Sequence, residues 1–216
     1  MKLLLPSIAS LLYLVFGTLA VPYNEQALVP SQEPYGKVNA DHLDKTRGVD
    51  SMVPCNQHQI RHISIGLGRA QEMLDDSYED VSGYWHGHSI PHKWFGAWTQ
   101  ARGNRVKEVL GKIKNRGTYE YTFSCSECED EDPGVVAYVY PDDFPRVTLC
   151  PEFWKPKFTT PTERGGALIH ELSHFPENGG TDDIEYGEQD CLHLARHHPD
   201  KAVENADSYE FFAEEY

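Results

Sequence analysis

Residues 167–175 read A-L-I-H-E-L-S-H-F, and a second stretch, residues 179–187, reads G-G-T-D-D-I-E-Y-G. Within the first stretch, His170, Glu171 and His174 form an H-E-x-x-H pattern. On a helix, side chains four residues apart lie on one face, one turn apart, so both imidazoles can bind the same zinc ion. Glu171 then lies beside the metal, where a carboxylate can act as the base that activates water. The pattern predicts a catalytic zinc helix that needs a third ligand.

The third ligand is expected from the residues that follow this helix. Asn178-Gly179-Gly180 allows the chain to reverse, because glycine tolerates a positive φ. Asp183 then follows His174 by nine residues, at a plausible distance for a return to the metal. Asp182 and Glu185 are also close, so spacing alone does not choose among the three carboxylates.

The residues that flank the motif are apolar, which indicates a helix that runs through the core. Leu168 and Ile169 precede it and Phe175 follows it. A buried pair of imidazoles with a carboxylate between them is unfavourable without a metal or other polar groups that bind them. Metal binding is therefore favoured over a coincidental pair of histidines on a solvated helix.

The composition is that of a soluble globular protein with an acidic balance. The chain has 216 residues, 39% of them hydrophobic and 25% charged, and a formal net charge of −15. This length suffices for one domain with a core and is too short for two large ones. The negative charge argues against general nucleic-acid binding, which needs a basic face. It is compatible with cationic substrates or peptides.

The N-terminal residues 1–20 have the organisation of a secretory signal peptide. Lys2 gives a positive start, residues 3–16 are largely apolar, and residues 17–20 end in small side chains. The apolar run is shorter than the ~20 residues that a membrane-spanning helix needs. We therefore predict cleavage after Ala20 and a secreted, extracellular protein without a membrane segment in its mature form.

Residues 21–50 lack the patterns of a folded domain. Three prolines interrupt any helix, and large apolar residues are few. Lys45-Thr46-Arg47-Gly48 offers basic residues to a processing protease, so the segment is either a pro-peptide or a disordered arm. The catalytic domain is expected over residues 51–216.

Hydrophobic spacing predicts helices at both ends of this domain and strands between them. Apolar residues recur every three or four positions over residues 60–74 and 103–113, as on one face of a helix. The region 118–149 contains short segments with the side chains of strands. Helical spacing returns from about Glu163 to Glu214. The fold class is therefore α+β: a single domain, mainly helical, with a small antiparallel sheet or meander.

An aromatic stretch between these helices, residues 84–98, contains three further histidines. His86, His88 and His92 form either a second metal site or substrate loop, or part of an aromatic surface loop. We favour the surface loop.

Four of the five cysteines are expected in disulfides. In an oxidising compartment Cys55, Cys125, Cys128 and Cys150 are better disulfide partners than metal ligands. Cys125-x-x-Cys128 has the form of half a zinc ribbon, but no second C-x-x-C follows it. Cys191 is left over, as a free buried thiol or, less favoured, in an intermolecular bridge.

Three segments together resemble the aspzincin metalloendopeptidases, the deuterolysin family, and most closely their fungal peptidyl-lysine branch. They are H-E-L-S-H at residues 170–174, G-T-D-D-I-E-Y-G at 180–187 and N-A-D-S-Y-E-F-F-A-E at 205–214. The resemblance covers roughly residues 55–215 and implies a zincin-like fold. It implies one Zn²⁺ per chain, with Asp183 as the third ligand beside the two histidines. It also implies that Tyr186 donates a hydrogen bond to the oxyanion.

The resemblance further implies a substrate pocket and two disulfides. Asp207 and Glu210 are three residues apart on the last predicted helix, so both can face one pocket. In lysine-specific relatives, acidic residues at these positions receive the lysine after the cleaved bond, the P1′ residue. The implied disulfides are Cys55–Cys125 and Cys128–Cys150, although this chain has C-x-x-C where close relatives have C-x-C.

These patterns predict a secreted zinc endopeptidase, a monomer that hydrolyses peptide bonds with an activated water. Glu171 is the base and later the acid, and no covalent enzyme intermediate is needed. Its substrates would be peptides or proteins, with a preference for lysine at P1′. The alternative is a non-proteolytic secreted zinc-binding protein, such as a metal scavenger, surface antigen or effector. Intact Glu171 and Tyr186 argue against that alternative, because a scavenger needs neither.

Overall fold

The H-E-x-x-H motif lies on α5, the helix Pro161–His174. Its start is set by local sequence. The Glu163 backbone N–H donates to the Thr160 side chain at 3.1 Å, and the Thr160 N–H donates to the Glu163 carboxylate at 2.9 Å. This capping box satisfies N–H groups that a first helical turn leaves without partners. Pro161 occupies the first helical position, so the helix begins two residues before the predicted start.

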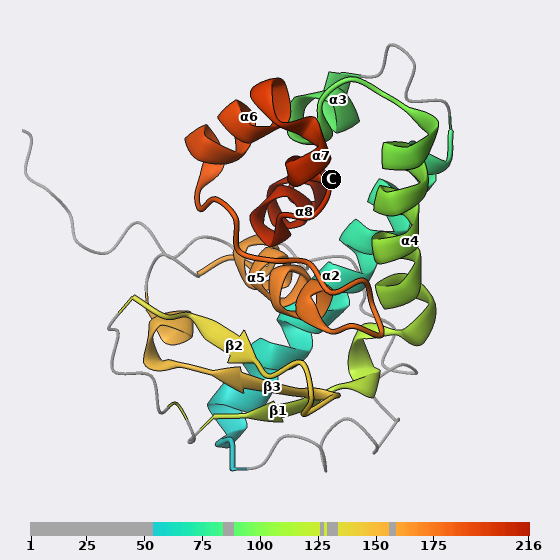
Figure 1. Cartoon of the computed structure of the whole chain (residues 1–216). Coiled ribbons are helices and arrows are strands. Elements are labelled where there is room, and N and C mark those ends of the chain that lie inside the picture. The colour runs from blue at the N-terminus through green and yellow to red at the C-terminus, as the bar shows by residue number, and fades with distance from the viewer. Residues whose placement is uncertain (1–53, 84–88, 126–127, 129–133, 156–158) are drawn as a thin grey trace, which may run out of the picture. The chain divides into compact units, whose positions relative to one another are not determined.

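The computed structural model describes residues 54–83, 89–125, 128, 134–155 and 159–216 (Figure 1). All of them belong to one compact unit, Leu43–Tyr216. The predicted signal peptide and the predicted arm or pro-peptide lie outside the described residues and stay predictions. None of the described helices is both long and apolar enough to cross a bilayer.

The described elements follow the predicted order of helices, strands and helices. The helices before the sheet are α2 (Gln57–Ser82), α3 (Ser89–Phe95) and α4 (Gln100–Arg116), followed by the short 3₁₀ helix η2 (Thr118–Glu120). The strands are β1 (Thr122–Ser124), β2 (Ala137–Val139) and β3 (Arg146–Leu149), followed by η3 (Pro151–Trp154). After α5 come α6 (Glu188–His197), α7 (Pro199–Ala202) and α8 (Ala206–Ala213).

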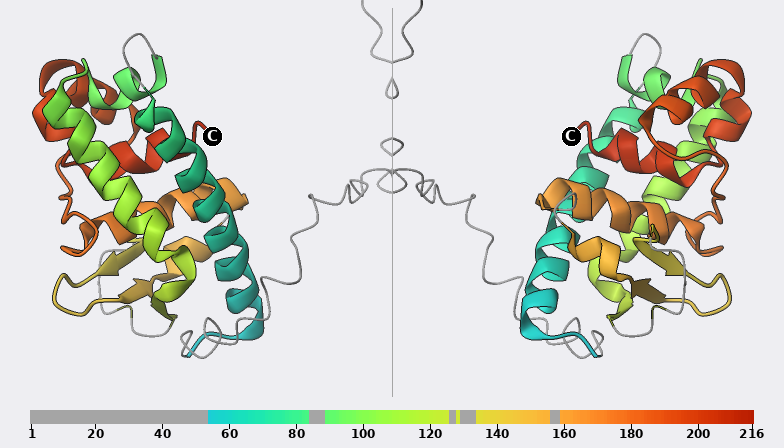
Figure 2. Two further views of the ribbon diagram at one scale, coloured as in Figure 1. Left: turned by 90° about the vertical axis from the view of Figure 1, so that its right-hand side faces the viewer. Right: turned by 90° about the vertical axis from the view of Figure 1, so that its left-hand side faces the viewer.

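Helix α5 lies between the sheet and the C-terminal helices. The three strands lie on one side of it and α6, α7 and α8 on the other, and both views of Figure 2 agree with this arrangement. The helix packs against α2 and α8. Side chains on α5 can therefore face both the sheet and α8, which is the arrangement that positions the site.

Two consecutive glycines let α5 approach its neighbours closely. A Cβ at Gly165 would lie 3.0 Å from the backbone nitrogen of Ala70 on α2. A Cβ at Gly166 would overlap the carboxyl group of Glu214, which follows α8. This close packing accounts for two helix-weak residues near the start of α5.

The sheet is mixed, which differs from the predicted antiparallel sheet or meander. Its strand order is β1-β3-β2, with β2 antiparallel to β3 and β1 parallel to it. Side-chain alternation predicts a strand but carries no information on the direction of its neighbour. The first strand begins only at Thr122, because residues 118–120 form η2 after Gly117, whose φ is 89°.

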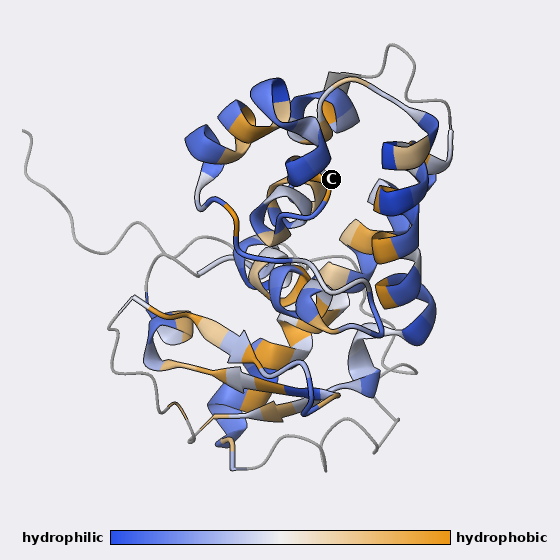
Figure 3. Ribbon diagram, viewed as in Figure 1, coloured by the Kyte–Doolittle hydropathy of each residue, from blue (hydrophilic) through white to orange (hydrophobic). Residues whose placement is uncertain are grey.

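The core is built from the predicted apolar faces. On α2, Ile63, Leu67, Ala70 and Leu74 are fully buried, and Ile60 packs against them partly buried. Figure 3 shows apolar residues gathered where α2, α4 and the strands face the interior. The structure is mainly helical with a small sheet, so the predicted fold class is confirmed.

Both expected disulfides are present. Cys55 is bonded to Cys125, 70 residues away, and Cys128 is bonded to Cys150. The fifth cysteine, Cys191, is free and fully buried. Of the three histidines in the aromatic stretch, His86 and His88 lie outside the described residues. His92 is exposed, as predicted, but it lies on helix α3, so the predicted loop is wrong for this residue.

Candidate metal centre

The ring of His174, at the end of α5, is held by the loop that follows. Its Nδ1 lies 2.7 Å from the carbonyl oxygen of Thr181. Because a carbonyl only accepts, Nδ1 carries the proton and the lone pair of Nε2 remains for another group. Thr181 is itself tied to α5: its N–H donates to the Ser173 carbonyl at 3.1 Å, and the two hydroxyls lie 2.5 Å apart. These contacts suit a supporting role for Thr181 in orienting His174.

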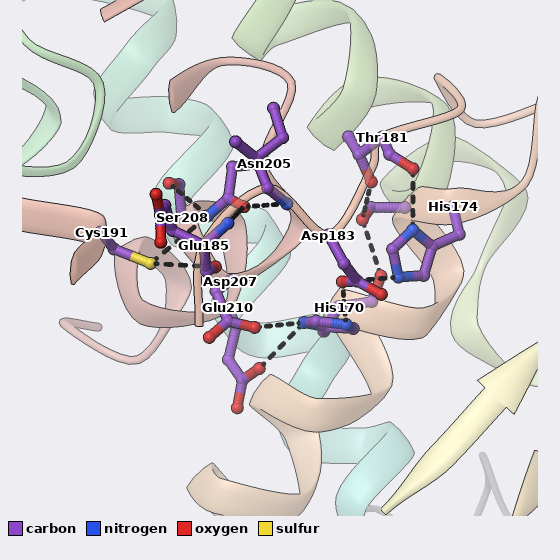
Figure 4. Close-up of polar contacts among 12 residues, drawn as sticks. His170, His174, Thr181, Asp183, Glu185, Cys191, Asn205, Asp207, Ser208 and Glu210 are labelled. Carbon is purple, nitrogen blue, oxygen red and sulfur yellow. Dashed lines mark hydrogen bonds and ion pairs between the residues drawn. The ribbon is translucent and has the colours of Figure 1, made fainter. Parts of the chain in front are cut away.

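The ring of His170 faces two carboxylates of α8 through its Nδ1. This nitrogen lies 2.8 Å from Oδ1 of Asp207 and 3.3 Å from Oε2 of Glu210 (Figure 4). Neither oxygen lies in line with the ring N–H, so the contacts are ion-pair contacts rather than well-formed hydrogen bonds. Acceptors again lie on the Nδ1 side, which leaves Nε2 to face away from α8.

Asp183 lies where these two Nε2 atoms converge. Its Oδ1 is 3.1 Å from Nε2 of His170 and 3.4 Å from Nε2 of His174. The chain reverses before it through Gly179 and Gly180, whose φ values of 150° and 66° are rarely adopted by other residues. The predicted glycine turn is therefore confirmed.

Of the three carboxylates that spacing left open, Asp183 is the one brought to the imidazoles. Asp182 and Glu185 are exposed, and neither belongs to a group of potential metal ligands among the described residues. The backbone of Asp182 instead pairs with the segment before α8, because its N–H donates to the Glu204 carbonyl and its carbonyl accepts from the Ala206 N–H. This pairing fixes the backbone beside Asp183.

The electrostatics of the protein groups favour a cation between these atoms. Burial lowers the pKa of His170, but the carboxylates of Asp183, Asp207 and Glu210 outweigh it, so the pKa lies well above its usual value. In the same way burial lowers and Asp183 raises the pKa of His174, with a net rise. Burial raises the pKa of Asp183, yet the two imidazoles bring it far below its usual value. Nitrogen lone pairs that face a carboxylate repel it unless a proton or a metal ion lies between them.

The donor set fits a metal ion. Nε2 of His170, Nε2 of His174 and an oxygen of Asp183 all lie within 4.8 Å of one another. Two imidazoles and one carboxylate are the three protein ligands of many catalytic zinc sites, which keep a further position open. His170 also forms a second group with Asp207 and Glu210, but through Nδ1, whose N–H has no lone pair to donate to a metal.

A cavity of about 920 Å³ opens beside the three donor atoms and contains the predicted catalytic groups in its lining. Glu171 is 7% exposed, and burial raises the pKa of its carboxyl. Tyr186 is 63% exposed at the cavity. Partial burial and then the neighbouring Asp183 carboxylate raise its pKa to about 12, so the phenol keeps its proton. Asp207 and Glu210 line the same cavity.

Asn205, a buried residue that was not among the predicted site residues, organises the loop that carries Asp183. Its Oδ1 accepts from the backbone N–H of Ile184 at 3.0 Å and of Glu185 at 2.9 Å. Its Nδ2 donates to Cys191 Sγ at 3.3 Å. Asn205 occupies the N-cap of α8 but makes no side-chain capping bond there. An asparagine before a helix predicts a cap, so no sequence signal distinguished this other use.

An ion pair between Arg105 of α4 and Glu204 also holds this loop. Arg105 donates to both carboxylate oxygens of Glu204 and, at 2.9 Å, to the carbonyl of Gly179. Glu204 directly precedes Asn205, so the glycine turn and the start of α8 are tied together. Nothing in the spacing of these residues predicts the contact.

Comparisons with known proteins agree with this geometry. A sequence profile described as "Lysine-specific metallo-endopeptidase", that of the aspzincin family, matches residues 87–214. The chain belongs to this family. It is therefore a metalloendopeptidase, an enzyme that acts on peptides or proteins, and the predicted relationship is confirmed.

Individual relatives match more than half of this chain. The chain is 36% identical over 164 residues to "Peptidyl-Lys metalloendopeptidase" from Pleurotus ostreatus, a match that covers 76% of this chain and 96% of the relative. It is 42% identical over 122 residues to "Extracellular protease" from Aeromonas hydrophila, which covers 56% of this chain and 34% of that protein. A solved zinc peptidase from Grifola frondosa is similar in structure, with a TM-score of 0.68 at 33% identity, covering 74% of this chain and 96% of that one.

Proposed function

We propose that this aspzincin is a secreted zinc endopeptidase that prefers lysine at P1′. The observation that carries the proposal is the convergence of Nε2 of His170, Nε2 of His174 and Oδ1 of Asp183 beside a cavity that also contains Glu171. In this proposal the three residues hold one zinc ion per chain. The name of the Grifola structure supports zinc as the metal.

The chemistry divides between the ion and the side chains around it. Bound zinc supplies a Lewis acid that polarises the scissile carbonyl and makes water acidic enough to react at neutral pH. Glu171 receives the proton of the attacking water and passes it to the leaving amine. Its burial suits this role, because a raised pKa brings a carboxylate closer to the operating pH of a general base.

Tyr186 is proposed as the donor to the oxyanion of the tetrahedral intermediate. Its pKa of about 12 keeps the hydroxyl protonated at neutral pH, as a donor must be. Its exposure of 63% argues against a purely packed aromatic and leaves room for substrate beside it.

The preference for lysine is proposed from the acidic wall of the cavity. Asp207 and Glu210 lie on one face of α8 and both line the cavity, so their negative charge favours an ammonium group over an apolar side chain. The names of the family and of the Pleurotus relative support lysine as the preferred residue.

Secretion is proposed from the N-terminal sequence and from the cysteine chemistry. Residues 1–20 are proposed as the signal peptide, residues 21–50 as a pro-peptide or arm, and residues 51–216 as the catalytic domain of a monomer. Two disulfides among the described residues support an oxidising compartment, as does the name of the Aeromonas relative.

The test is peptide cleavage with the metal and the base varied separately. The protein is incubated with a peptide that contains one lysine, and the products are read by mass spectrometry. We expect cleavage on the N-terminal side of lysine, loss with a zinc chelator and recovery when zinc is added back. Glu171→Gln should abolish turnover but keep the bound zinc, whereas Glu177→Gln, at an exposed carboxylate outside the cavity, should change neither. An intact peptide after incubation with zinc-loaded protein would refute the proposal.

A further inference from the structure

Asp207, in the first turn of α8, uses both of its carboxylate oxygens within the protein. Oδ1 lies 2.8 Å from Nδ1 of His170, and Oδ2 accepts a hydrogen bond from the backbone N–H of Gly187 at 2.6 Å. Its side chain is only 10% exposed. Asp207 therefore contacts His170 of α5 (Figure 4) and, through Gly187, the end of the loop that carries Asp183 and Tyr186.

Glu210, one turn later on the same face of α8, makes fewer contacts within the protein. Only its Oε2 contacts His170, at the longer distance of 3.3 Å, and the side chain is 17% exposed. Within the part of the chain that the structure describes, Oε1 has no hydrogen-bond partner. Because Glu210 also lines the cavity, this oxygen can accept a hydrogen bond from a cationic group that enters it.

The two environments suit different tasks. A carboxylate beside the outer nitrogen of a metal-binding imidazole orients the ring and increases its basicity, and removal of such a group typically weakens metal binding 10–100-fold. A carboxylate that receives a substrate ammonium needs a free oxygen that points into the pocket. Asp207 meets the first requirement and Glu210 the second.

The loop contacts strengthen the assignment of Asp207. Asn205 binds the backbone of Ile184 and Glu185, and Asp207 binds the backbone of Gly187, so the start of α8 holds the loop on both sides of Tyr186. A substrate lysine that recruited Oδ2 of Asp207 would have to compete with the hydrogen bond from Gly187.

We propose that Asp207 is a positioning residue that orients His170 and the Tyr186 loop, so that of the two acidic residues only Glu210 keeps the lysine-binding role already proposed for the pair. The Glu210 assignment rests on the proposed lysine preference. The Asp207 assignment requires only that His170 binds the metal.

The first measurement is zinc affinity, by competition with a chromophoric chelator at constant pH. Asp207→Asn should weaken zinc binding about 10–100-fold, because an amide keeps the shape but loses the charge beside His170. Glu210→Gln should stay within about threefold of the unchanged protein. Asp190→Asn, at an exposed carboxylate on α6, is the matched control and should change nothing.

The second measurement compares two peptides at saturating zinc, identical except for lysine or the uncharged norleucine at P1′. Glu210→Gln should lower the ratio of kcat/KM for lysine over norleucine by about tenfold or more. Asp207→Asn should lower kcat/KM for both peptides together and leave their ratio unchanged within about threefold. Equal loss of the ratio in both variants, or unchanged zinc affinity in Asp207→Asn, would overturn the division of roles.

A readout on the unaltered protein remains decisive if Asp207→Asn does not fold. In ¹⁵N-edited NMR of the zinc-loaded protein, the Nδ1–H proton of His170, which faces a carboxylate, should resonate downfield of the Nδ1–H proton of His174, which faces a backbone carbonyl. An equal or more upfield position would refute the role of Asp207. Unchanged protein that cleaves neither peptide would refute the proposed function together with the Glu210 assignment, and zinc titration would still decide on Asp207.

Discussion

Glu214 should make the stability of the fold fall as pH rises, and Glu214→Gln should remove that fall. The residue follows α8, and its carboxyl lies in the space left by Gly166 on α5. Burial, and then the negative charges of Glu210, Glu163 and Asp207, raise its pKa to about 8. No ion pair with a cation is found for Glu214 among the described residues. A neutral carboxyl therefore occupies this position at pH 7.

The sign follows from the proton balance. Between its usual pKa of 4.5 and about 8, the folded chain keeps the proton of Glu214 and the unfolded chain releases it. Stability therefore decreases as pH rises through this window. A rise from 4.5 to about 8 sets an upper limit of about 5 kcal/mol, at about 1.4 kcal/mol per pKa unit. Because the side chain is partly exposed and solvent screens it, we expect about 2 kcal/mol.

Thermal unfolding at pH 5 and pH 8 measures this difference. Glutamine carries no titrating proton, so Glu214→Gln should raise the Tm relative to the unchanged protein by about 4–8 °C more at pH 8 than at pH 5. Glu177→Gln is the control, because it removes an exposed carboxylate outside the acidic cluster. The same Tm difference at both pH values, or a smaller one at pH 8, would refute the proton balance argued for Glu214.

Three further predictions concern packing, catalysis and the disulfides. Gly166→Ala should destabilise the fold by about 1–3 kcal/mol in urea unfolding, because its Cβ overlaps the Glu214 carboxyl, and Glu214→Ala should recover part of that loss in the double variant. If the double variant recovers none of the lost stability, the overlap with Glu214 is not the cause of the loss. Tyr186→Phe should lower kcat about 100-fold without changing zinc affinity, because only the donor to the oxyanion is lost. Steady-state kinetics measures kcat, and a zinc titration measures the affinity. A fully active variant would exclude Tyr186 as the oxyanion donor. Replacement of both Cys55 and Cys125 by alanine should lower the free energy of unfolding by up to about 4 kcal/mol, from the 70-residue separation that the bond closes; an unchanged urea midpoint would contradict this.

The sequence predicts best what local periodicity controls. The apolar spacing of residues 60–74 predicted the buried face of α2, and the H-E-x-x-H pattern predicted that His170 and His174 lie on one face of a helix. Both follow from the 3.6-residue period of the helix, a property of the local chain alone. Strand direction is not local. The parallel pairing of β1 with β3 depends on where the chain returns to the sheet, and the sequence of a three-residue strand does not indicate this.

In the candidate site, too, local spacing could be read from the sequence, whereas contacts between distant segments could not. Spacing left Asp182, Asp183 and Glu185 open as third ligands, and the family resemblance rather than the physics favoured Asp183. The structure adds the reason: the backbone of Asp182 pairs with the segment before α8, and this pairing turns the next side chain towards the imidazoles. The partner segment lies some twenty residues downstream, so no local pattern contains it.

Helix α8 contributes more to the candidate site than its own sequence indicates, again because the contacts are made with residues far away in the chain. Three residues apart on a helix, Asp207 and Glu210 were expected to face one pocket, and they do. What a single helix cannot reveal is that His170 of α5 lies against both carboxylates. In the proposed site, His170 would be oriented through Asp207, and the loop that carries Asp183 is held by residues at the start of the same helix. The packing of α8 on α5, which the glycine pair of α5 allows, therefore places the proposed metal-positioning residue and the proposed lysine-binding residue side by side, although each has its own task.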